Sequence, residues 1–343
     1  MNFIDLLPAI GAVVAGLVVL VWSADKFVDG AVGIAKFCGM STLLIGMVIV
    51  GFGTSAPEMV VSALSAMEGS PQLALGNAYG SNVANIALIL GVTAMISPIV
   101  VKRSVLKRDL PILIGVTLLS FFLVMDGAVA RLDGVIFLAV FALVMGWNIY
   151  SEKRKAKETG ASSVQESSEE SEKNMGLGMS IFWLVLGMGL LVGSSRALVW
   201  GAVDIAHRFG VSDLLIGLTI VAIGTSLPEL ASSIAAARKG EDDLAVGNII
   251  GSNLFNTLMV VGIASTISPM NSIEHEVITR DMPLMAALTL ALFFLGFRRK
   301  GDGRINRVAG IVFLLVYVGY LGILVAQAKG IDVMGMIGLS SAK

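Results

Sequence analysis

The sequence predicts an all-α integral membrane protein in which ten transmembrane helices form two inverted-topology five-helix repeats. Composition, the spacing of apolar segments and an internal repeat lead to this prediction. Of the 343 residues, 56% are hydrophobic and only 14% are charged, and the mean hydropathy is +0.87. A soluble domain of this length needs far more polar surface. The chain is therefore expected to lie in a lipid bilayer.

Ten segments are apolar over the length of about 20 residues that a membrane-crossing helix needs. The first is expected to be a spanning helix rather than a cleaved signal, because no basic residues precede its apolar run and no small-x-small site follows it. The predicted spans are 7–30, 42–67, 73–98, 110–127, 132–150, 177–203, 213–237, 243–269, 282–297 and 306–327.

The basic residues predict the orientation of these spans. The loops after odd-numbered spans hold 17 of the 24 Lys and Arg residues, whereas the other loops and the C-terminal tail hold five. Because cytoplasmic loops are enriched in Lys and Arg, both termini are expected outside. The predicted location is the plasma membrane, the inner membrane if the chain is bacterial. Residues 151–176, rich in Ser, Glu and Lys, are predicted to be a disordered cytoplasmic linker.

Composition also excludes several classes of protein. A net charge of −1 leaves no general basic surface for nucleic acid. The single cysteine, Cys38, cannot form an internal disulfide and is expected to be a packing residue. No nucleophile–base pair, HExxH sequence or phosphate-binding loop is present, so we predict neither an enzyme nor a cofactor.

The two halves of the chain repeat each other. Residues 30–99 align without gaps with residues 201–270 at an offset of 171, and 33 of the 70 positions are identical. Most of the identities, 20 of the 33, fall on Gly, Thr, Ser, Pro, Glu and Asn, and "RDLP" at 108–111 recurs as "RDMP" at 280–283. We predict a first repeat at 1–150 and a second at 177–343. Each holds an odd number of spans, so the second is inverted, and such folds place the substrate site near the midplane.

The first repeated motif is Gly-Thr-Ser-x-Pro-Glu. Because proline has no N–H, the carbonyl oxygens of Gly53 and Gly224 lose their helical partners and are expected to point inward. Hydroxyl groups on the same turn and a carboxylate one turn later add further oxygen atoms. The side chains concerned are Thr54, Ser55 and Glu58 in the first half and Thr225, Ser226 and Glu229 in the second.

The second repeated motif is Gly-Asn-x-x-Gly-Ser-Asn-x-x-Asn. Its polar residues at intervals of four share one helical face: Asn77, Ser81 and Asn85, and likewise Asn248, Ser252 and Asn256. Ser81 and Ser252 are predicted ligands, whereas Asn77 and Asn248 are as readily explained as scaffold. Asn82 and Asn253 lie off this face and are expected to pack.

Both motifs offer hard oxygen donors and no His, Cys or Met, which suits Na⁺, Ca²⁺ or Mg²⁺. Two carboxylates balance one divalent ion, or two monovalent ions with a third held by neutral oxygens. Without cations, both glutamates are expected to take up protons in the bilayer. The partners that the sequence predicts are therefore inorganic cations and lipid, and it does not specify an oligomeric state.

The duplicated "GTSAPE…GNAYGSNVAN" and "GTSLPE…GNIIGSNLFN" resemble the α-repeats of the cation/calcium antiporter superfamily, in its bacterial sodium/calcium exchanger-like branch. The resemblance implies an exchanger fold with a central Ca²⁺ site and flanking Na⁺ sites. Glu58, Glu229 and the carbonyls of Thr54 and Thr225 would then bind Ca²⁺. The Na⁺ sites would use Ser55, Ser81, Ser226, Ser252 and the carbonyls of Gly51 and Ala222.

One departure from that family concerns the charge of the site. Several relatives carry Asp at one of the positions matching Asn85 and Asn256, and here both are Asn. The site then has two formal negative charges, which leaves K⁺ dependence and stoichiometry open.

The leading prediction is Na⁺/Ca²⁺ exchange by alternating access, with the first and sixth spans sliding past the site. The alternative is H⁺-coupled antiport of Ca²⁺ or Na⁺ through the same two glutamates. Two inverted halves argue against a channel.

Overall fold

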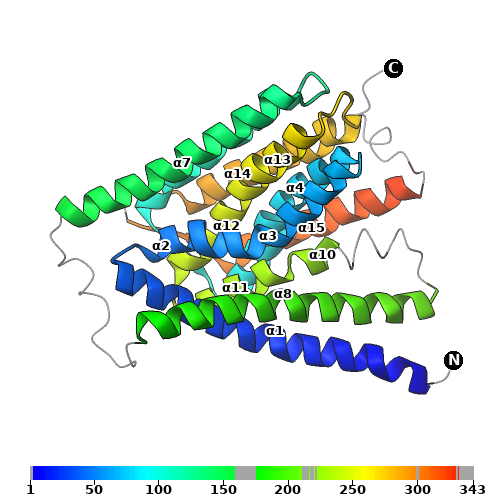
Figure 1. Cartoon of the computed structure of the whole chain (residues 1–343), viewed down its shortest axis with the longest axis horizontal. Helices are drawn as coiled ribbons and strands as arrows, with labels where there is room; N and C mark the ends of the chain where they lie inside the picture. The colour runs from blue at the N-terminus through cyan, green and yellow to red at the C-terminus, as the bar shows by residue number, and fades with distance from the viewer. Residues whose placement is uncertain are drawn as a thin grey trace.

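The computed structural model describes residues 3–158, 175–210, 216, 220, 222–298, 301–329 and 331 of the chain, and these are almost entirely helical (Figure 1). The predicted linker at 151–176 starts later than expected, because residues 151–158 continue helix α7. Its central part, 159–174, lies outside the described residues. So does most of the first part of the predicted span at 213–237.

Several helical runs contain a π-helical stretch, written η, within one continuous helix. The elements of the first half are α1 (Phe3–Cys38), α2 (Thr42–Ile45), η1 (Gly46–Val50), α3 (Gly51–Met67), α4 (Pro71–Ala84), η2 (Asn85–Leu90), α5 (Gly91–Ile96), β1 (Ile99–Val101), η3 (Val105–Asp109), α6 (Leu110–Val124) and α7 (Arg131–Glu158). Those of the second half are α8 (Leu177–Arg208), α10 (Ala222–Thr225), α11 (Leu227–Arg238), α12 (Asp242–Leu254), η5 (Phe255–Val260), α13 (Val261–Ile267), η6 (Val277–Asp281), α14 (Met282–Gly296), β2 (Gly303–Ile305) and α15 (Arg307–Ala328).

Within the described residues, eight helical runs are long and apolar enough to cross a membrane. Each coincides with a predicted span to within a few residues at most ends. The remaining predictions are 110–127 and 213–237. The first of these forms α6, which has 15 residues and follows the charged turn η3. The second is described mainly from Ala222 onward, as α10 and α11.

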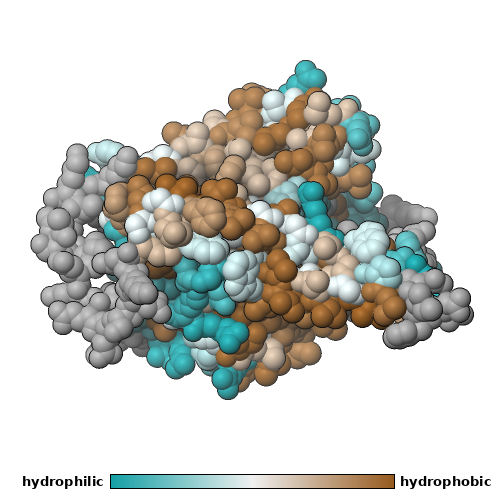
Figure 2. All heavy atoms as spheres, turned by 60° about the horizontal axis from the view of Figure 1, so that its bottom comes forward, coloured by the Kyte–Doolittle hydropathy of each residue, from teal (hydrophilic) through white to brown (hydrophobic). Residues whose placement is uncertain are grey.

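Burial separates the spans into a central and a peripheral group. The run α12–η5–α13 is almost wholly buried, and α4–η2–α5 is mostly buried. In contrast α1, α7, α8 and α15 expose apolar side chains such as Val18, Leu143 and Leu315. Hydrophobic side chains cover much of the face in Figure 2. Exposed apolar surface on this scale needs lipid around it, so the chain is a multi-pass membrane protein.

Helices α1 and α8 pack along each other at the bottom of Figure 1, and each contacts the other more extensively than it contacts the rest of the described protein. Glycines allow this close approach. A Cβ on Gly187 would lie 2.9 Å from Cα of Phe27, and one on Gly30 would lie 2.5 Å from the Leu184 nitrogen. Gly201, the repeat equivalent of Gly30, packs in the same way against the Ala9 carbonyl. The two long helices therefore form one tightly packed pair.

The ends of the helices follow the inverted repeat. The start of α1 and the end of α15 lie at one end of the molecule, and the end of α7 and the start of α8 lie at the other (Figure 1). At the α7–α8 end, β1 pairs antiparallel with β2, with Ile99 opposite Ile305. At the other end Met270, the repeat equivalent of Ile99, exchanges two backbone hydrogen bonds of 2.8 and 2.9 Å with Val129.

Two local expectations are corrected by the structure. Cys38 is exposed at the end of α1 and is not a packing residue. The two three-residue strands were not predicted, because such short segments carry no recognisable alternation.

Candidate cation-binding site

Two carboxylates from opposite halves of the chain meet in the protein interior. Glu58 lies in α3 and Glu229 in α11, and each is 3% exposed. They are near enough for their charges to repel each other. Neither is in an ion pair within the described part of the chain. The structure therefore brings together the two glutamates that the repeat had singled out.

Thr54 joins the two halves beside these carboxylates. Its hydroxyl oxygen lies 3.1 Å from the Val50 carbonyl, 3.2 Å from Oδ1 of Asn248 and 3.5 Å from the hydroxyl of Ser252. Since Asn248 and Ser252 lie in α12, the first motif of one half contacts the second motif of the other.

Five buried oxygen atoms of the two repeated motifs have no hydrogen-bond partner among the described residues. They are Oγ of Ser55, Oε2 of Glu58, Oε2 of Glu229, Oδ1 of Asn82 and Oδ1 of Asn256. Leaving buried oxygens unpaired costs free energy unless another group satisfies them. A dehydrated cation has this effect, and the oxygens come from both halves.

Asn82 is one of these residues and was expected only to pack. Its amide donates to Oγ1 of Thr257 at 2.8 Å, so the amide nitrogen has a scaffold role while the oxygen is left without a partner. Asn253 behaves as expected, because its Oδ1 accepts a 2.9 Å hydrogen bond from the amide of Asn85. That bond connects α12 to the start of η2. Ser81, in contrast, lies at the wall of a cleft.

The two prolines act differently in the two halves. In the first, α3 continues through Pro57. In the second, the helix is interrupted at Ser226, and Pro228 lies in the first turn of α11. The Gly224 carbonyl, expected to be unpaired, accepts a 2.8 Å hydrogen bond from the hydroxyl of Ser195 in α8. Sequence reasoning missed Ser195, because it lies outside the aligned repeat.

The remaining predicted positions stand at element ends or contacts. Gly51 begins α3, and a Cβ there would lie 3.1 Å from the Ser252 nitrogen, so α3 and α12 touch at this point. Ala222 begins α10, directly before the motif. Thr225 ends α10 and is exposed to the cleft. Clusters of three or more His, Cys, Asp or Glu do not occur in the described ranges.

A cleft of about 1010 Å³ leads to the site from one end of the molecule. Its mouth is formed by residues 69–73 and 268–274, and its described walls come from α4, η6 and α15. It reaches Ser81, Thr225 and Ser226. These motif residues can therefore exchange ions with solvent on that side.

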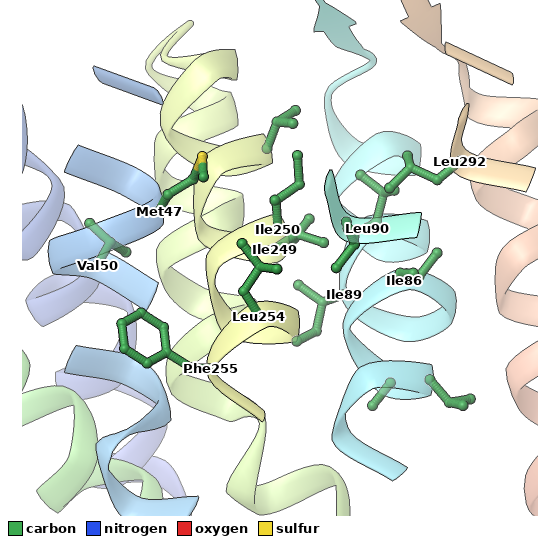
Figure 3. Close-up of a cluster of buried hydrophobic side chains, with 14 of the residues drawn as sticks. Met47, Val50, Ile86, Ile89, Leu90, Ile249, Ile250, Leu254, Phe255 and Leu292 are labelled. Carbon is green, nitrogen blue, oxygen red and sulfur yellow. The ribbon is translucent and has the colours of Figure 1, made fainter. Parts of the chain in front are cut away.

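Apolar side chains close the opposite side. Figure 3 shows Ile249, Ile250 and Leu254 of α12 between Met47 and Val50 of η1 and the side chains of η2. All five of these residues are buried. Along the run α4–η2 the cleft residues come first and the apolar cluster follows Asn85. Motif residues that neighbour Glu229 in sequence, Thr225 and Ser226, thus line the cleft on one face, and apolar side chains pack on the other.

Two inverted halves, a buried carboxylate pair and a cleft that reaches the neighbouring motif residues from one face are typical of a secondary transporter of cations. Comparison with known proteins supports this class. The chain is 47% identical over 308 residues to the protein CaxA of Alkalimonas amylolytica, which covers 90% of this chain and 96% of the relative. It is 32% identical to sodium/calcium exchanger MaX1 of Methanosarcina acetivorans, again over 90% and 96% of the two chains.

The fold is also that of a solved exchanger. The sodium-calcium exchanger NCX_Mj, soaked with Na⁺ and Sr²⁺, superposes with a TM-score of 0.77 at 30% identity, covering 92% of this chain and 97% of the other. The sequence pattern of the family described as sodium/calcium exchanger protein matches residues 8–150 and 179–326. The chain belongs to the sodium/calcium exchanger family, which consists of secondary transporters and not enzymes, as the sequence predicted.

Proposed function

We propose that this protein exchanges Na⁺ for Ca²⁺ across the membrane by alternating access, with both ions bound in turn between the two halves. The observation that carries the proposal is the meeting of Glu58 and Glu229 beside buried oxygens that lack partners. Ca²⁺ takes six to eight oxygen ligands, and carboxylates supply the charge that it needs. Two carboxylates neutralise one Ca²⁺ or two Na⁺.

We assign the ligands from the resemblance of the two motifs to those of the exchanger family. Glu58 and Glu229 bind Ca²⁺ together with the backbone carbonyls of Thr54 and Thr225. Na⁺ binds to either side of this position, where hydroxyl, amide and carbonyl oxygens stand. The residues assigned to Na⁺ are Ser55, Ser81, Ser226, Ser252, Asn85 and Asn256, with the carbonyls of Gly51 and Ala222. Burial supports this set, since Ser55, Ser226, Ser252 and both Asn are at most 2% exposed and Ser81 faces the cleft.

Neutral oxygens make an electrogenic cycle possible. If a third Na⁺ is held by neutral oxygens, exchange for one Ca²⁺ moves one net charge, worth about 2.3 kcal/mol per 100 mV of membrane potential. The membrane potential would then drive Ca²⁺ out of the cell. The Na⁺ gradient and the membrane potential set this direction. The orientation assigned by the basic residues places both termini and the cleft outside and residues 151–176 in the cytoplasm.

The α1–α8 pair is the part of the protein best suited to move. It is held together by close glycine contacts, and its two helices contact each other more extensively than they contact the rest of the described protein. Sliding of this pair along the membrane normal would cover the cleft on one side and expose the site on the other. The two repeats, 1–150 and 177–343, then each supply one moving helix and four helices of the remaining body.

The test uses the purified chain in proteoliposomes. Uptake of ⁴⁵Ca²⁺ is measured with a Na⁺ gradient alone, a pH gradient alone, and both gradients absent. The proposal predicts that ⁴⁵Ca²⁺ enters the vesicles when an outward Na⁺ gradient is imposed. With the pH gradient alone, ⁴⁵Ca²⁺ uptake should not exceed background. Uptake that ignores Na⁺ and follows the pH gradient would contradict it and select proton-coupled antiport.

A further inference from the structure

The second repeated motif is enclosed in one half of the chain and open in the other. Asn248 is 1% exposed, whereas its repeat equivalent Asn77 is half-buried and lines the cleft. Leu244 is 1% exposed, whereas its equivalent Leu73 is 66% exposed in the cleft. Each pair has the same residue type at the same motif position. The difference therefore lies in what surrounds these residues and not in the residues themselves.

Asn248 uses both ends of its amide. Its nitrogen donates to the hydroxyl of Ser233 at 2.9 Å, the hydroxyl of Ser232 at 3.1 Å and the carbonyl of Glu229 at 3.3 Å. Its oxygen accepts from the Thr54 hydroxyl at 3.2 Å. A side chain held at both ends has one orientation. Asn248 therefore ties Thr54 of the first half to the helix that carries Glu229.

Asn77 keeps only part of the equivalent arrangement. Its nitrogen donates to the hydroxyl of Ser62 at 3.2 Å, which matches the bond from Asn248 to Ser233. Thr225, the equivalent of Thr54, lines the same cleft as Asn77. The two groups needed for the equivalent of the Thr54–Asn248 bond thus stand at one water-accessible opening.

We infer that Asn248 and Asn77 are positioning residues that act in turn, the asparagine on the closed side holding the threonine of the other half. In the state described here Asn248 holds Thr54; in the opposite-facing state Asn77 holds Thr225 and Asn248 releases Thr54. The inference rests on the proposed alternating access. When each half of an inverted repeat adopts the conformation of the other, the site closes on one side of the membrane and opens on the other. Neither asparagine needs to touch the ion, because each acts through a threonine and a neighbouring glutamate.

The test is the reactivity of a cysteine at Leu73, which the inference expects to be exposed here and buried in the opposite state, as Leu244 is. Full-length L73C protein with C38S, to remove the exposed native thiol, is purified in detergent and labelled with a soluble maleimide in ion-free buffer. N248A removes a contact of the open-cleft state, and N77A removes one of the opposite state. We expect labelling at least about twofold slower in N248A than in N77A. Equal rates, or slower labelling in N77A, would overturn the inference.

The Ca²⁺ dependence of transport, measured separately from each side of the membrane, is a second readout. Loss of folding would not change it on one side only. N248A is expected to raise the half-maximal Ca²⁺ concentration at the face with the cleft, and N77A is expected to raise it at the opposite face. An equal effect of both variants on both faces would show a merely structural role. Absence of Na⁺-driven Ca²⁺ flux in the unmodified chain would overturn the proposed function instead, and the labelling comparison does not depend on flux.

A milder pair keeps the test decisive if N248A does not fold. S233A removes one acceptor of Asn248, and S62A removes the equivalent acceptor of Asn77. Slower labelling of L73C in S233A than in S62A supports the inference, and equal rates overturn it.

Discussion

The ammonium nitrogen of Lys239 lies 2.5 Å from a carboxylate oxygen of Asp29 and 2.8 Å from the backbone carbonyl of Asp25. Lys239 stands in the turn between α11 and α12, and both aspartates lie in α1. The contact ties the α1–α8 pair to the helix that carries Glu229. It must break if that pair slides.

Removing this contact is expected to favour the opposite-facing state. The Lys239 and Asp29 side chains are each 31% exposed, and such ion pairs contribute about 0.2–1 kcal/mol. K239A should therefore slow maleimide labelling of L73C, with a change in the conformational equilibrium of at most about fivefold. K102A is the control, because Lys102 forms a 2.6 Å ion pair with Asp243 that does not involve α1 or α8. Equal labelling of K239A and K102A would contradict the role of Lys239.

The repeat places opposite charges at the equivalent positions of the other half. Glu68 is equivalent to Lys239 and Arg196 to Asp25, and both are exposed without an ion pair in the described part of the chain. We expect the opposite-facing state to bring them together. In a C38S background, E68C with R196C should form a disulfide more readily once K239A is added. A crosslinking yield unaffected by K239A would show that the two sites do not approach.

Ser195 is expected to stabilise the interrupted helix of the second half. Its hydroxyl satisfies the Gly224 carbonyl, and an unsatisfied buried carbonyl costs about 1–3 kcal/mol. S195A should lower the free energy of unfolding in mixed micelles by this amount. S194A is the control, because Ser194 bonds only to Leu191 within its own helix. Equal losses of stability in both variants would contradict this role.

Equivalent glycines should respond differently to the same substitution. A Cβ on Gly251 would lie 2.7 Å from Cα of Met47, whereas one on Gly80 meets no described atom within 4 Å. G251A should destabilise the protein by roughly 1–3 kcal/mol through overpacking. G80A should leave the unfolding transition unchanged. A destabilised G80A with an unaffected G251A would reverse the assignment of the open and closed halves.

Hydropathy was sufficient to predict most spans, because a lipid-facing helix such as α15 and a buried one such as α12 both need long apolar runs. The predicted span 110–127 coincides with α6 (Leu110–Val124), but hydropathy did not show that the helical stretch extends back through η3, which carries Lys107, Arg108 and Asp109. The extension of α7 past residue 150 was also missed, because a helix that leaves the bilayer no longer needs apolar residues.

The repeat was sufficient to single out Glu58 and Glu229, since a buried carboxylate beside a proline stands out in any apolar run. It could not distinguish Asn77 from Asn248, because identical residues in two inverted copies differ only in the conformation that surrounds them. The roles of Ser195 and of the carbonyl oxygens of the site depend on tertiary contacts, which sequence periodicity does not predict.

Direct measurement of Ca²⁺ binding tests most sharply whether one glutamate from each half holds the transported ion. Equilibrium dialysis with ⁴⁵Ca²⁺ would compare the unmodified protein with E58Q, E229Q and E68Q, the last of which changes the exposed Glu68 directly after α3. We predict one Ca²⁺ per chain, an affinity lowered about a hundredfold or more in both E58Q and E229Q, and no change in E68Q. Binding of unchanged strength in either E58Q or E229Q would contradict the account.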